Sequence, residues 1–273
     1  MSQNIASRAN PIYTAIRKSI LRTLKVLGLD HSVRKIRHSY KKMAGEVVQI
    51  SIGRVQAEYV DYTLLNEELL KTEKKIIDDI VDSVKEGDVF YDIGADAGLY
   101  TCLVSKAVSD QGTVVAFEPH PTRKLQLIDN LHINNVSAEV RTEALSDEEK
   151  KGVINYSLKT KSGEVVNVND DKGHGNIVNI VRGDTIVEKE KLPTPDVIKI
   201  DVEGAELRVL KGFRKILSDV DNCMVYIELH DEISNFGGSK SEVLEFLRDI
   251  NYEVELLETR ETSSTQEFLK ATK

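Results

Sequence analysis

The stretch Val89–Thr101, VFYDIGADAGLYT, decides which fold the chain adopts. An apolar run stops at Asp92, and Gly94 and Gly98 then flank a short turn that leads into the next apolar segment. Glycine lets the backbone approach a ligand closely, and the first turn of a helix carries N–H groups without intrahelical partners. In an open α/β sheet, ligands bind beyond the carboxyl ends of the strands, where the strand order reverses. The stretch therefore predicts a strand, a ligand-binding turn and a helix.

Strands and helices alternate along the following sequence. Short apolar runs predict strands at 88–93, 113–118, 138–145, 196–201, 222–229, 252–258 and 266–271. Apolar residues at helical spacing predict helices near 98–109, 121–134, 205–218 and 240–250. This alternation predicts an α/β fold with a mostly parallel sheet and helices on both faces. No helix separates the last two strands, so we expect them to pair as an antiparallel hairpin.

The chain is predicted to have three successive parts. Residues 1–45 form a basic helical arm, 46–84 form a hairpin that turns near Gly53 and then a helix, and 85–273 form the main domain. An insertion at about 146–195 interrupts the main domain and contains short β-like runs and a polar loop. The composition, 40% apolar and 30% charged residues, is that of a soluble globular protein.

The arm differs in charge from the rest of the chain. Residues 1–43 hold ten Lys or Arg and one acid, a net charge of +9, whereas the remainder holds 27 basic and 44 acidic residues, a net charge of −17. One interpretation is a helical arm that packs on the main domain or on a second subunit of a homo-oligomer. A second is a basic amphipathic surface that contacts anionic lipid or a lipid-linked substrate at the membrane. A third is an organelle transit peptide.

The two cysteines indicate a reducing compartment. Cys102 and Cys223 are far apart and match neither a metal-binding nor a disulfide spacing. Each lies in an apolar segment, which predicts a reduced core residue. The N-terminus lacks the apolar core of a secretory signal, so we expect a cytoplasmic protein, peripheral at the membrane if the arm binds lipid.

The turn around Gly94 and Gly98 favours a positively charged nucleoside ligand. Its spacing, D-x-G-x-x-x-G, differs from the G-x-G-x-x-G of dinucleotide-binding proteins. An acid two residues before the first glycine suits S-adenosylmethionine, which carries an ammonium and a sulfonium. Glu118 ends the second predicted strand, twenty residues after Gly98, where an acid can bind ribose hydroxyls. The alternative for Glu118 is a solvated strand end.

Further carboxylates follow two other predicted strands. In PDVIKIDVEGAELRVLKG, Pro195–Gly212, the strand ends in Asp201, and Glu203 and Glu206 follow it. Carboxylates at the end of an apolar strand cost free energy unless they have partners or a function. We expect Asp201 to face the glycine-containing turn across the crevice. The next strand, in MVYIELH, delivers Glu228 and His230 to the same rim.

Four blocks together identify a family. FYDIGADAG, AFEPHP with LIDNLHINN, IKIDVEGAE with VLKG, and IELH, in this order, resemble the FkbM-type family of S-adenosylmethionine-dependent methyltransferases over about residues 85–231. The resemblance implies a class I methyltransferase Rossmann-like fold with a seven-stranded sheet. It also implies three groups of cofactor-binding residues: Asp92, Gly94, Ala95, Asp96 and Gly98 for the methionine part, Glu118 for the ribose, and Ala144, Leu145 and Ser146 for the adenine. One departure is Asp96, where the family more often has asparagine.

Methyl transfer to a hydroxyl needs a group that accepts the hydroxyl proton. The candidate catalytic residues are Asp201, Glu203 and His230, with Glu228 on the same rim. His230 has a suitable unperturbed pKa, about 6.5, and Asp201 has the better predicted position. Alternatively, His230 is a strand-end histidine bonded to backbone, or the acceptor is a carboxylate that needs no base. Asp201 with Glu228 or His230 could also ligate a divalent metal, but we expect none.

The expected acceptor is a small molecule or a glycan. The acidic main domain argues against nucleic acid, whose binding requires a basic face. The family implies hydroxyls of sugars, glycans and polyketides, and the insertion with its polar loop should wall the acceptor site. We therefore expect O-methylation of a sugar, of a free or lipid-linked glycan, or of another small polar metabolite. Two alternatives are an NAD-dependent oxidoreductase and a non-catalytic relative that binds cofactor or a protein partner.

Overall fold

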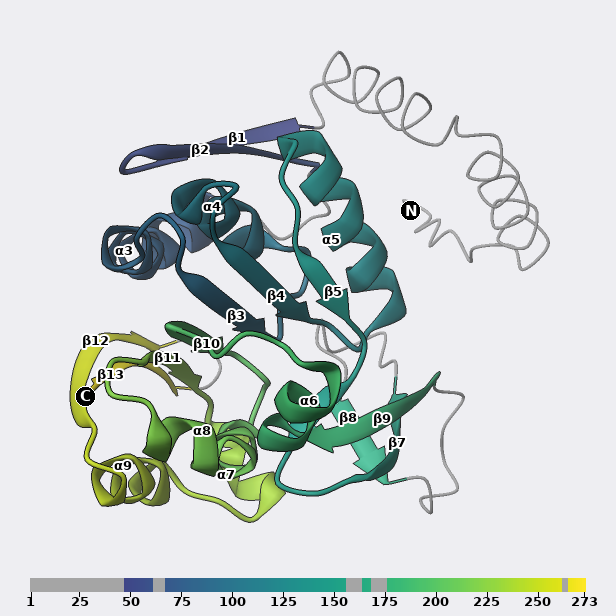
Figure 1. Cartoon of the computed structure of the whole chain (residues 1–273), viewed down its shortest axis with the longest axis vertical. Coiled ribbons are helices and arrows are strands. Elements are labelled where there is room, and N and C mark those ends of the chain that lie inside the picture. Colours follow the sequence, from purple (N-terminus) through teal and green to yellow (C-terminus); the bar gives the residue numbers. More distant parts are fainter. Residues whose placement is uncertain (1–46, 61–66, 156–163, 168–175, 262–264) are drawn as a thin grey trace, which may run out of the picture. The chain divides into compact units, whose positions relative to one another are not determined.

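The computed structural model describes residues 47–60, 67–155, 164–167, 176–261 and 265–273 (Figure 1). The chain divides into two compact units, Met1–Val47 and Val48–Lys273, and every described residue except Val47 belongs to the second. The predicted arm and nearly all of the polar loop at 169–176 therefore lie outside the described residues.

The main sheet has seven strands in the order β12-β13-β11-β10-β3-β4-β5. They are β3 (Val89–Ile93), β4 (Thr113–Phe117), β5 (Glu139–Arg141), β10 (Val197–Ile200), β11 (Met224–Leu229), β12 (Glu253–Glu261) and β13 (Thr265–Thr272). All neighbouring strands are parallel except the two pairs that involve β13, which are antiparallel. The seven-stranded sheet and its final hairpin are confirmed. The strand order reverses at β3, which pairs with β4 on one side and β10 on the other.

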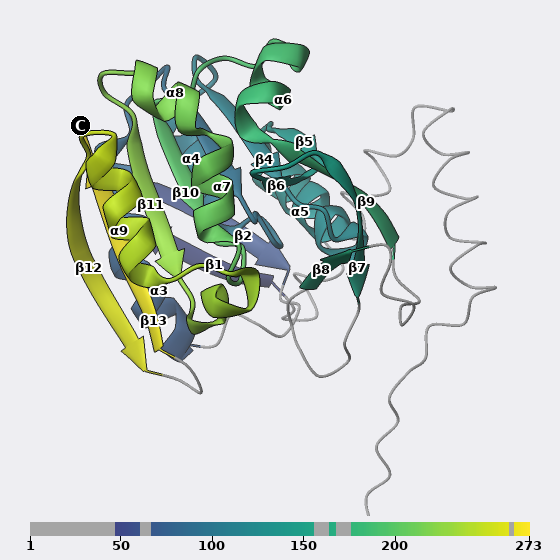
Figure 2. The ribbon, with the colours of Figure 1, turned by 90° about the horizontal axis from the view of Figure 1, so that it is seen from below.

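Helices cover both faces of this sheet (Figures 1 and 2). The helices are α3 (Glu67–Ser83), α4 (Leu99–Val108), α5 (Pro121–Asn134), α6 (Gly183–Glu190), α7 (Glu206–Gly212), α8 (Arg214–Asp219) and α9 (Lys240–Asp249), with a short 3₁₀ helix η1 (Asp231–Phe236). Successive residues of a strand point to opposite faces. Phe90 therefore packs with α3, α4 and α5, and the next residue, Tyr91, packs with α6, α7, α8 and α9.

The predicted hairpin is present and ties two helices together. It consists of β1 (Val47–Ile52) and β2 (Val55–Val60), and Gly53 at its turn has φ +49°. Tyr59 donates a hydrogen bond of 2.7 Å from its hydroxyl to the carbonyl of Leu99 at the start of α4. The backbone N–H of Glu58 donates to the side chain of Asn134 at the end of α5. The hairpin thus supports the helix that follows the turn around Gly94.

Two predicted elements differ in the structure. The strand expected at 138–145 is two strands, because β5 ends at Arg141 and Ala144–Ser146 forms β6 in a separate four-stranded sheet, β6-β9-β7-β8. The helix expected at 205–218 is two helices that meet at Phe213. Both departures have a tertiary cause. Phe213 packs against Gly183, where an added Cβ would lie 2.3 Å from the ring.

The described part of the insertion contains strands, as its β-like runs predicted, and a helix. The separate sheet also contains β7 (Lys150–Asn155), β8 (Glu164–Asn167) and β9 (Asn176–Arg182), and Figure 2 shows it on the opposite side of the molecule from β12 and β13. Helix α6, which we did not predict, follows β9. Its Asp184 accepts hydrogen bonds of 3.0 Å from the backbone N–H groups of Lys215 and Ile216 at the start of α8. The carboxylate thereby satisfies donors that a helix start leaves unpaired.

Both cysteines are free and buried, as predicted. No helix in the described part of the chain combines the length and apolar character that crossing a membrane requires.

A substitution at Gly212, the last residue of α7, tests how closely the four-stranded sheet approaches this helix. An alanine Cβ at this position would lie 2.1 Å from the carbonyl oxygen of Ser146 in β6. Helix propensity alone predicts that Gly212→Ala stabilises by about 1 kcal/mol. We expect the opposite sign, a loss of about 2 kcal/mol, because backbone atoms cannot yield cheaply.

Urea denaturation measures this difference. Lys211→Ala, one position earlier on the exposed side of α7, is the control and should change the free energy of unfolding by less than about 0.5 kcal/mol. Gly212→Ala with unchanged or raised stability would contradict the close contact.

Candidate active site

The turn from Gly94 to Gly98, here called the glycine turn, is packed tightly at the carboxyl end of β3. Gly94 and Ala95 donate backbone hydrogen bonds of 3.0 and 3.1 Å to the carbonyl of Phe117 at the end of β4. Gly94 has φ +81°, and an added Cβ would lie 1.8 Å from the carbonyl oxygen of Asp201. Asp96 also has a left-handed backbone, φ +46°. The glycine turn therefore touches the end of β10 directly, as the sequence predicted for Asp201.

Asp92 lies beneath the glycine turn and is 1% exposed. Thr101 donates a hydrogen bond of 2.5 Å to its Oδ2. Its Oδ1 has no hydrogen-bond partner among the described residues and lies 3.9 Å from Nζ of Lys199. Burial raises the pKa of Asp92, and the ammonium of Lys199 opposes this shift. A buried carboxylate oxygen without a donor suits a cationic ligand group.

Lys199 is the buried cation of the site, and it lies opposite Asp92 in the register of β10 and β3. Its Nζ lies 3.1 Å from Oδ2 of Asp201 and 4.4 Å from the ring centroid of Tyr100. Burial alone would lower the pKa of Lys199, but Asp201, Asp92 and Glu228 raise it above the ordinary value. Sequence analysis did not assign this residue to the site. The feature of the sequence that could have identified it is a lysine within an otherwise apolar strand, VIKI.

Glu118, at the end of β4, is buried and accepts two backbone hydrogen bonds of 2.7 Å, from Asp96 to Oε2 and from His120 to Oε1. The pKa of Glu118 is raised to about 8, chiefly by burial and also by the Asp96 carboxylate, while the backbone donors oppose the shift. Asp96 in turn pairs with Arg123 at 2.8 Å. The alternative of a solvated strand end is wrong for Glu118.

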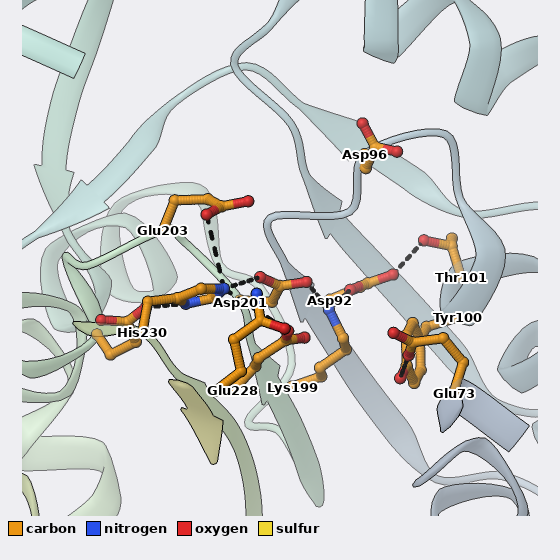
Figure 3. A network of polar contacts seen from close by, with 12 residues as sticks. Glu73, Asp92, Asp96, Tyr100, Thr101, Lys199, Asp201, Glu203, Glu228 and His230 are labelled. Atoms are coloured by element: carbon orange, nitrogen blue, oxygen red, sulfur yellow. Dashed lines mark hydrogen bonds and ion pairs between the residues drawn. The ribbon is translucent and has the colours of Figure 1, made fainter. Parts of the chain in front are cut away.

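Five side chains form the histidine cluster: Asp201, Glu203, Glu206, Glu228 and His230 (Figure 3). Nδ1 of His230 lies 2.8 Å from Oε1 of Glu206, and both side chains are buried. Nε2 of His230 lies 3.6 Å from Glu203, 3.6 Å from Glu228 and 3.8 Å from Asp201. His230 is therefore bound by a carboxylate rather than by backbone, the alternative that the sequence left open.

The environment changes the protonation of His230. Burial alone would lower the pKa of His230, but the Glu206 hydrogen bond, Asp201 and Glu203 raise it to about 10. The imidazole therefore carries a proton at neutral pH in this arrangement. The unperturbed pKa near 6.5, which favoured His230 as a base, does not apply here.

The members of the histidine cluster differ in access to solvent. The side chain of Glu203 is 48% exposed, that of Asp201 is 27% exposed and that of His230 is 2% exposed. Glu203 has φ +54°, a left-handed conformation that costs a non-glycine residue about 1–2 kcal/mol. Burial raises the pKa of Glu203, and Asp201 adds to this effect. Burial would also raise the pKa of Asp201, but Lys199 and His230 lower it.

A second buried network adjoins Glu228. Arg260, from β12, pairs with Glu73 of α3 at 3.0 Å and lies 3.7 Å from Glu228. Tyr100 donates a short hydrogen bond to the other oxygen of Glu73. Burial raises the pKa of Glu228 well above its ordinary value. Sequence analysis missed Glu73 and Arg260, because they are distant in the chain and lie in segments without a motif.

The residues expected at the adenine, Ala144, Leu145 and Ser146, form β6 and pair with Ile180–Arg182 of β9. In the chain they come after β5, which ends three residues earlier, at Arg141. Leu145 packs in the core cluster that contains α7 and α8.

The family model described as methyltransferase FkbM domain matches residues 92–254, more than half of the 273 residues. The chain belongs to the FkbM methyltransferase domain family. The matched region begins at Asp92 and contains Glu118 and the whole histidine cluster. Carboxylates at the ends of β3, β4 and β10 thus belong to the family domain itself.

Two characterised relatives are methyltransferases. Hexuronic acid methyltransferase AglP of Haloferax volcanii is 30% identical over 173 residues, which cover 59% of this chain and 64% of the relative. Methyltransferase 1 of Beauveria bassiana is 27% identical over 171 residues, which cover 55% of this chain and 68% of the relative. The chain thus matches slightly less than two thirds of the archaeal relative.

Among solved structures, precorrin-6y C5,15-methyltransferase of Geobacter metallireducens superposes with a TM-score of 0.46 at 14% identity, over 78% of this chain and 93% of that chain.

Lys199 should be the most sensitive position for the stability of this FkbM domain. Lys199→Met leaves the buried Asp92 and the partly exposed Asp201 without their shared cation, so we expect a loss of about 3–5 kcal/mol in urea denaturation. Asp92→Asn added to Lys199→Met should recover part of the loss, because one carboxylate is then neutral. The exposed Lys215→Met is the control. A loss below about 1 kcal/mol for Lys199→Met would contradict the assigned role.

Proposed function

We propose that this FkbM-family chain is an S-adenosylmethionine-dependent methyltransferase that acts on a hydroxyl of a sugar or glycan. The observation that carries the proposal is Oδ1 of Asp92 beneath the glycine turn, which accepts no hydrogen bond from any described residue, with the buried carboxylate of Glu118 at the neighbouring strand end. One carboxylate suits the ammonium of the cofactor and the other suits its ribose.

The residues present fit this cofactor. Asp92 with the glycine turn would hold its methionine part, and Ala144–Ser146 would hold its adenine. Glu118 already accepts two backbone hydrogen bonds, but a carboxylate has about four acceptor sites and can still receive the ribose hydroxyls. When bound, the sulfonium supplies an electrophilic methyl group.

The histidine cluster would face the acceptor. A residue that takes the hydroxyl proton must reach the acceptor, and exposure favours Glu203 and Asp201 over the buried His230. We assign the proton to one of these two carboxylates, which would contribute roughly 10²–10⁴-fold to the rate. His230, held by Glu206, would be a positioning residue that orients both carboxylates. His230 is therefore not proposed as the base.

A cavity of about 340 Å³ supports a sugar acid as the acceptor. Its lining includes Gly204, directly after Glu203, the cations Arg208 and Lys211, the ring of Phe236 and the acids Asp147 and Glu148, and Arg208 lies 3.3 Å from Glu148. Arg208 stacks at 6.0 Å from the ring of Phe236. Guanidinium and ammonium groups bind carboxylates, and an aromatic ring offers an apolar surface to a sugar. The name of the archaeal relative, hexuronic acid methyltransferase, agrees with this chemistry.

Calorimetry with S-adenosylmethionine tests the cofactor assignment. We expect saturable binding to the full chain and none with NAD. Glu118→Gln should weaken binding by about ten- to a hundredfold, since a hydrogen bond to a charged group contributes about 1.5–3 kcal/mol. Glu188→Gln, on the exposed side of α6, is the control. Binding of NAD instead, or equal affinities for the two variants, would contradict the proposal.

Transfer assays test the acceptor. With labelled cofactor, we expect methylation of hexuronic acid glycans rather than neutral ones, and Arg208→Met should reduce this preference. Glu203→Gln or Asp201→Asn should reduce turnover about 10²–10⁴-fold while cofactor affinity is retained. Equal rates of methyl transfer to hexuronic acid glycans and to neutral glycans would contradict a sugar-acid acceptor.

Cofactor affinity should depend on pH through Glu118. Its raised pKa of about 8 means that it holds a proton at pH 6.5 and is ionised at pH 9. Ribose hydroxyls donate more strongly to the ionised form, so the ratio of wild-type to Glu118→Gln affinity should rise by about tenfold over this range. The ratio of the two affinities is used because protonation of the cofactor itself affects both proteins equally. The neighbouring residues Asp96, His120 and Arg123 are the same in both proteins. A constant ratio would contradict the shift.

A further inference from the structure

The histidine cluster concentrates negative charge around one buried nitrogen. Three carboxylates, those of Asp201, Glu203 and Glu228, lie within 3.8 Å of Nε2 of His230 (Figure 3). A fourth, Glu206, occupies Nδ1. Like charges this close repel unless a positive charge lies among them, and either a proton or a metal ion on Nε2 would supply it. Lys199 reaches only the Oδ2 side of Asp201.

The centre of the histidine cluster lacks hydrogen bonds. Within the described ranges, Nε2 of His230 has no hydrogen bond, because its three carboxylate neighbours lie at 3.6–3.8 Å. Glu228 is 7% exposed, and its nearest cationic atoms are Nε2 of His230 at 3.6 Å and a nitrogen of Arg260 at 3.7 Å. Buried polar groups are usually hydrogen-bonded. Two mostly buried groups that point at one spot without a hydrogen bond leave room there for a water molecule or a cation.

The spacing of these atoms suits a metal ion. Ligand atoms of Asp201, Glu203 and His230 all lie within 4.8 Å of one another. Ligands about 2.1 Å from an ion are about 3.0–4.2 Å apart when they lie on the same coordination sphere. The 3.6 and 3.8 Å from Nε2 to the two carboxylates fall within this range.

The partners of these ligands orient them toward the same point. Glu206 accepts hydrogen bonds of 2.8 Å at Oε1 from the backbone N–H of Gly204 and from Nδ1 of His230. A metal-binding histidine commonly donates its second nitrogen to a carboxylate in this way. Lys199 donates a hydrogen bond to Oδ2 of Asp201, and the other oxygen, Oδ1, points toward Nε2 of His230.

We propose that Asp201, Glu203 and His230 bind one divalent cation. The ligands are Oδ1 of Asp201, Oε2 of Glu203 and Nε2 of His230, and Glu228 would balance the charge from the second shell. One imidazole and two carboxylates suit an ion such as Mn²⁺, and three protein ligands leave coordination positions open. The site departs from the metal-free expectation drawn from the sequence.

The cation would provide a second contact for the acceptor, in addition to the side chains that line the cavity. Gly204, the residue after the proposed ligand Glu203, lines the cavity, so an acceptor bound there would lie near the cation and could offer an oxygen to an open coordination position. A bound cation lowers the pKa of a coordinated hydroxyl. This role rests on the proposed function, whereas cation binding itself does not.

Titration with Mn²⁺ tests the site on the full chain after removal of metals with a chelator. The paramagnetic resonance signal of free Mn²⁺ reports the unbound ion, so no enzymatic activity is needed. We expect one saturable site per chain. Glu203→Gln and Asp201→Asn should weaken it by about tenfold or more. Glu148→Gln, an acid on the neighbouring cavity wall, should leave it unchanged.

Thermal unfolding of each variant shows whether it is folded, and the half-exposed Glu203 makes Glu203→Gln the variant least prone to unfold. Unsaturable binding, or equal affinities of Glu203→Gln and Glu148→Gln, would overturn the proposal. Calorimetry with S-adenosylmethionine on the same chelator-treated protein keeps the two proposals apart. If the protein binds the cofactor but not Mn²⁺, only the proposed metal site is contradicted. If it binds Mn²⁺ but not the cofactor, only the methyltransferase assignment is contradicted.

Discussion

The site depends on one buried cation, the ammonium of Lys199. Parallel pairing of β10 with β3 sets Lys199 opposite Asp92, and two residues later the same strand ends at Asp201. The ammonium lies between the two carboxylates, at 3.9 and 3.1 Å. Without it, the buried carboxylate of Asp92 and the partly exposed one of Asp201, at adjacent strand ends, would repel each other, and Asp92 would lose hydration with no compensation. The point where the strand order reverses can therefore hold two acids because a lysine of the central strand neutralises them.

Close backbone packing joins the two halves of the site. Gly94 allows the glycine turn to rest against the carbonyl of Asp201, where a Cβ would be only 1.8 Å away. The turn proposed to hold the cofactor and the carboxylate proposed to face the acceptor are thus in direct contact. Reacting groups must be held about 3 Å apart and in line. A contact through backbone atoms is stiffer than one through side chains, so this junction preserves the alignment.

Environment rather than residue type separates the roles within the histidine cluster. His230 has the side chain most often used as a base, but its carboxylate neighbours keep it protonated or, as we propose, bound to a cation. Glu203 is solvated and strained, and Asp201 is shared between Lys199 and His230. The same carboxylates that raise the pKa of His230 also make the centre of the cluster a place for positive charge.

The sequence by itself determined the elements whose signals are local. The strand–turn–helix around Gly94, the hairpin at Gly53, the final antiparallel pair and the carboxylates at the strand ends follow from apolar periodicity and turn residues, and all are present. Tertiary structure decided which sheet Ala144–Ser146 joins, because three apolar and polar residues can pair with either edge. It also decided the protonation of His230, which depends on Glu206 and Glu228, and the pairing of Lys199 with Asp92, 107 residues earlier in the chain, because these side chains meet only when the sheet forms.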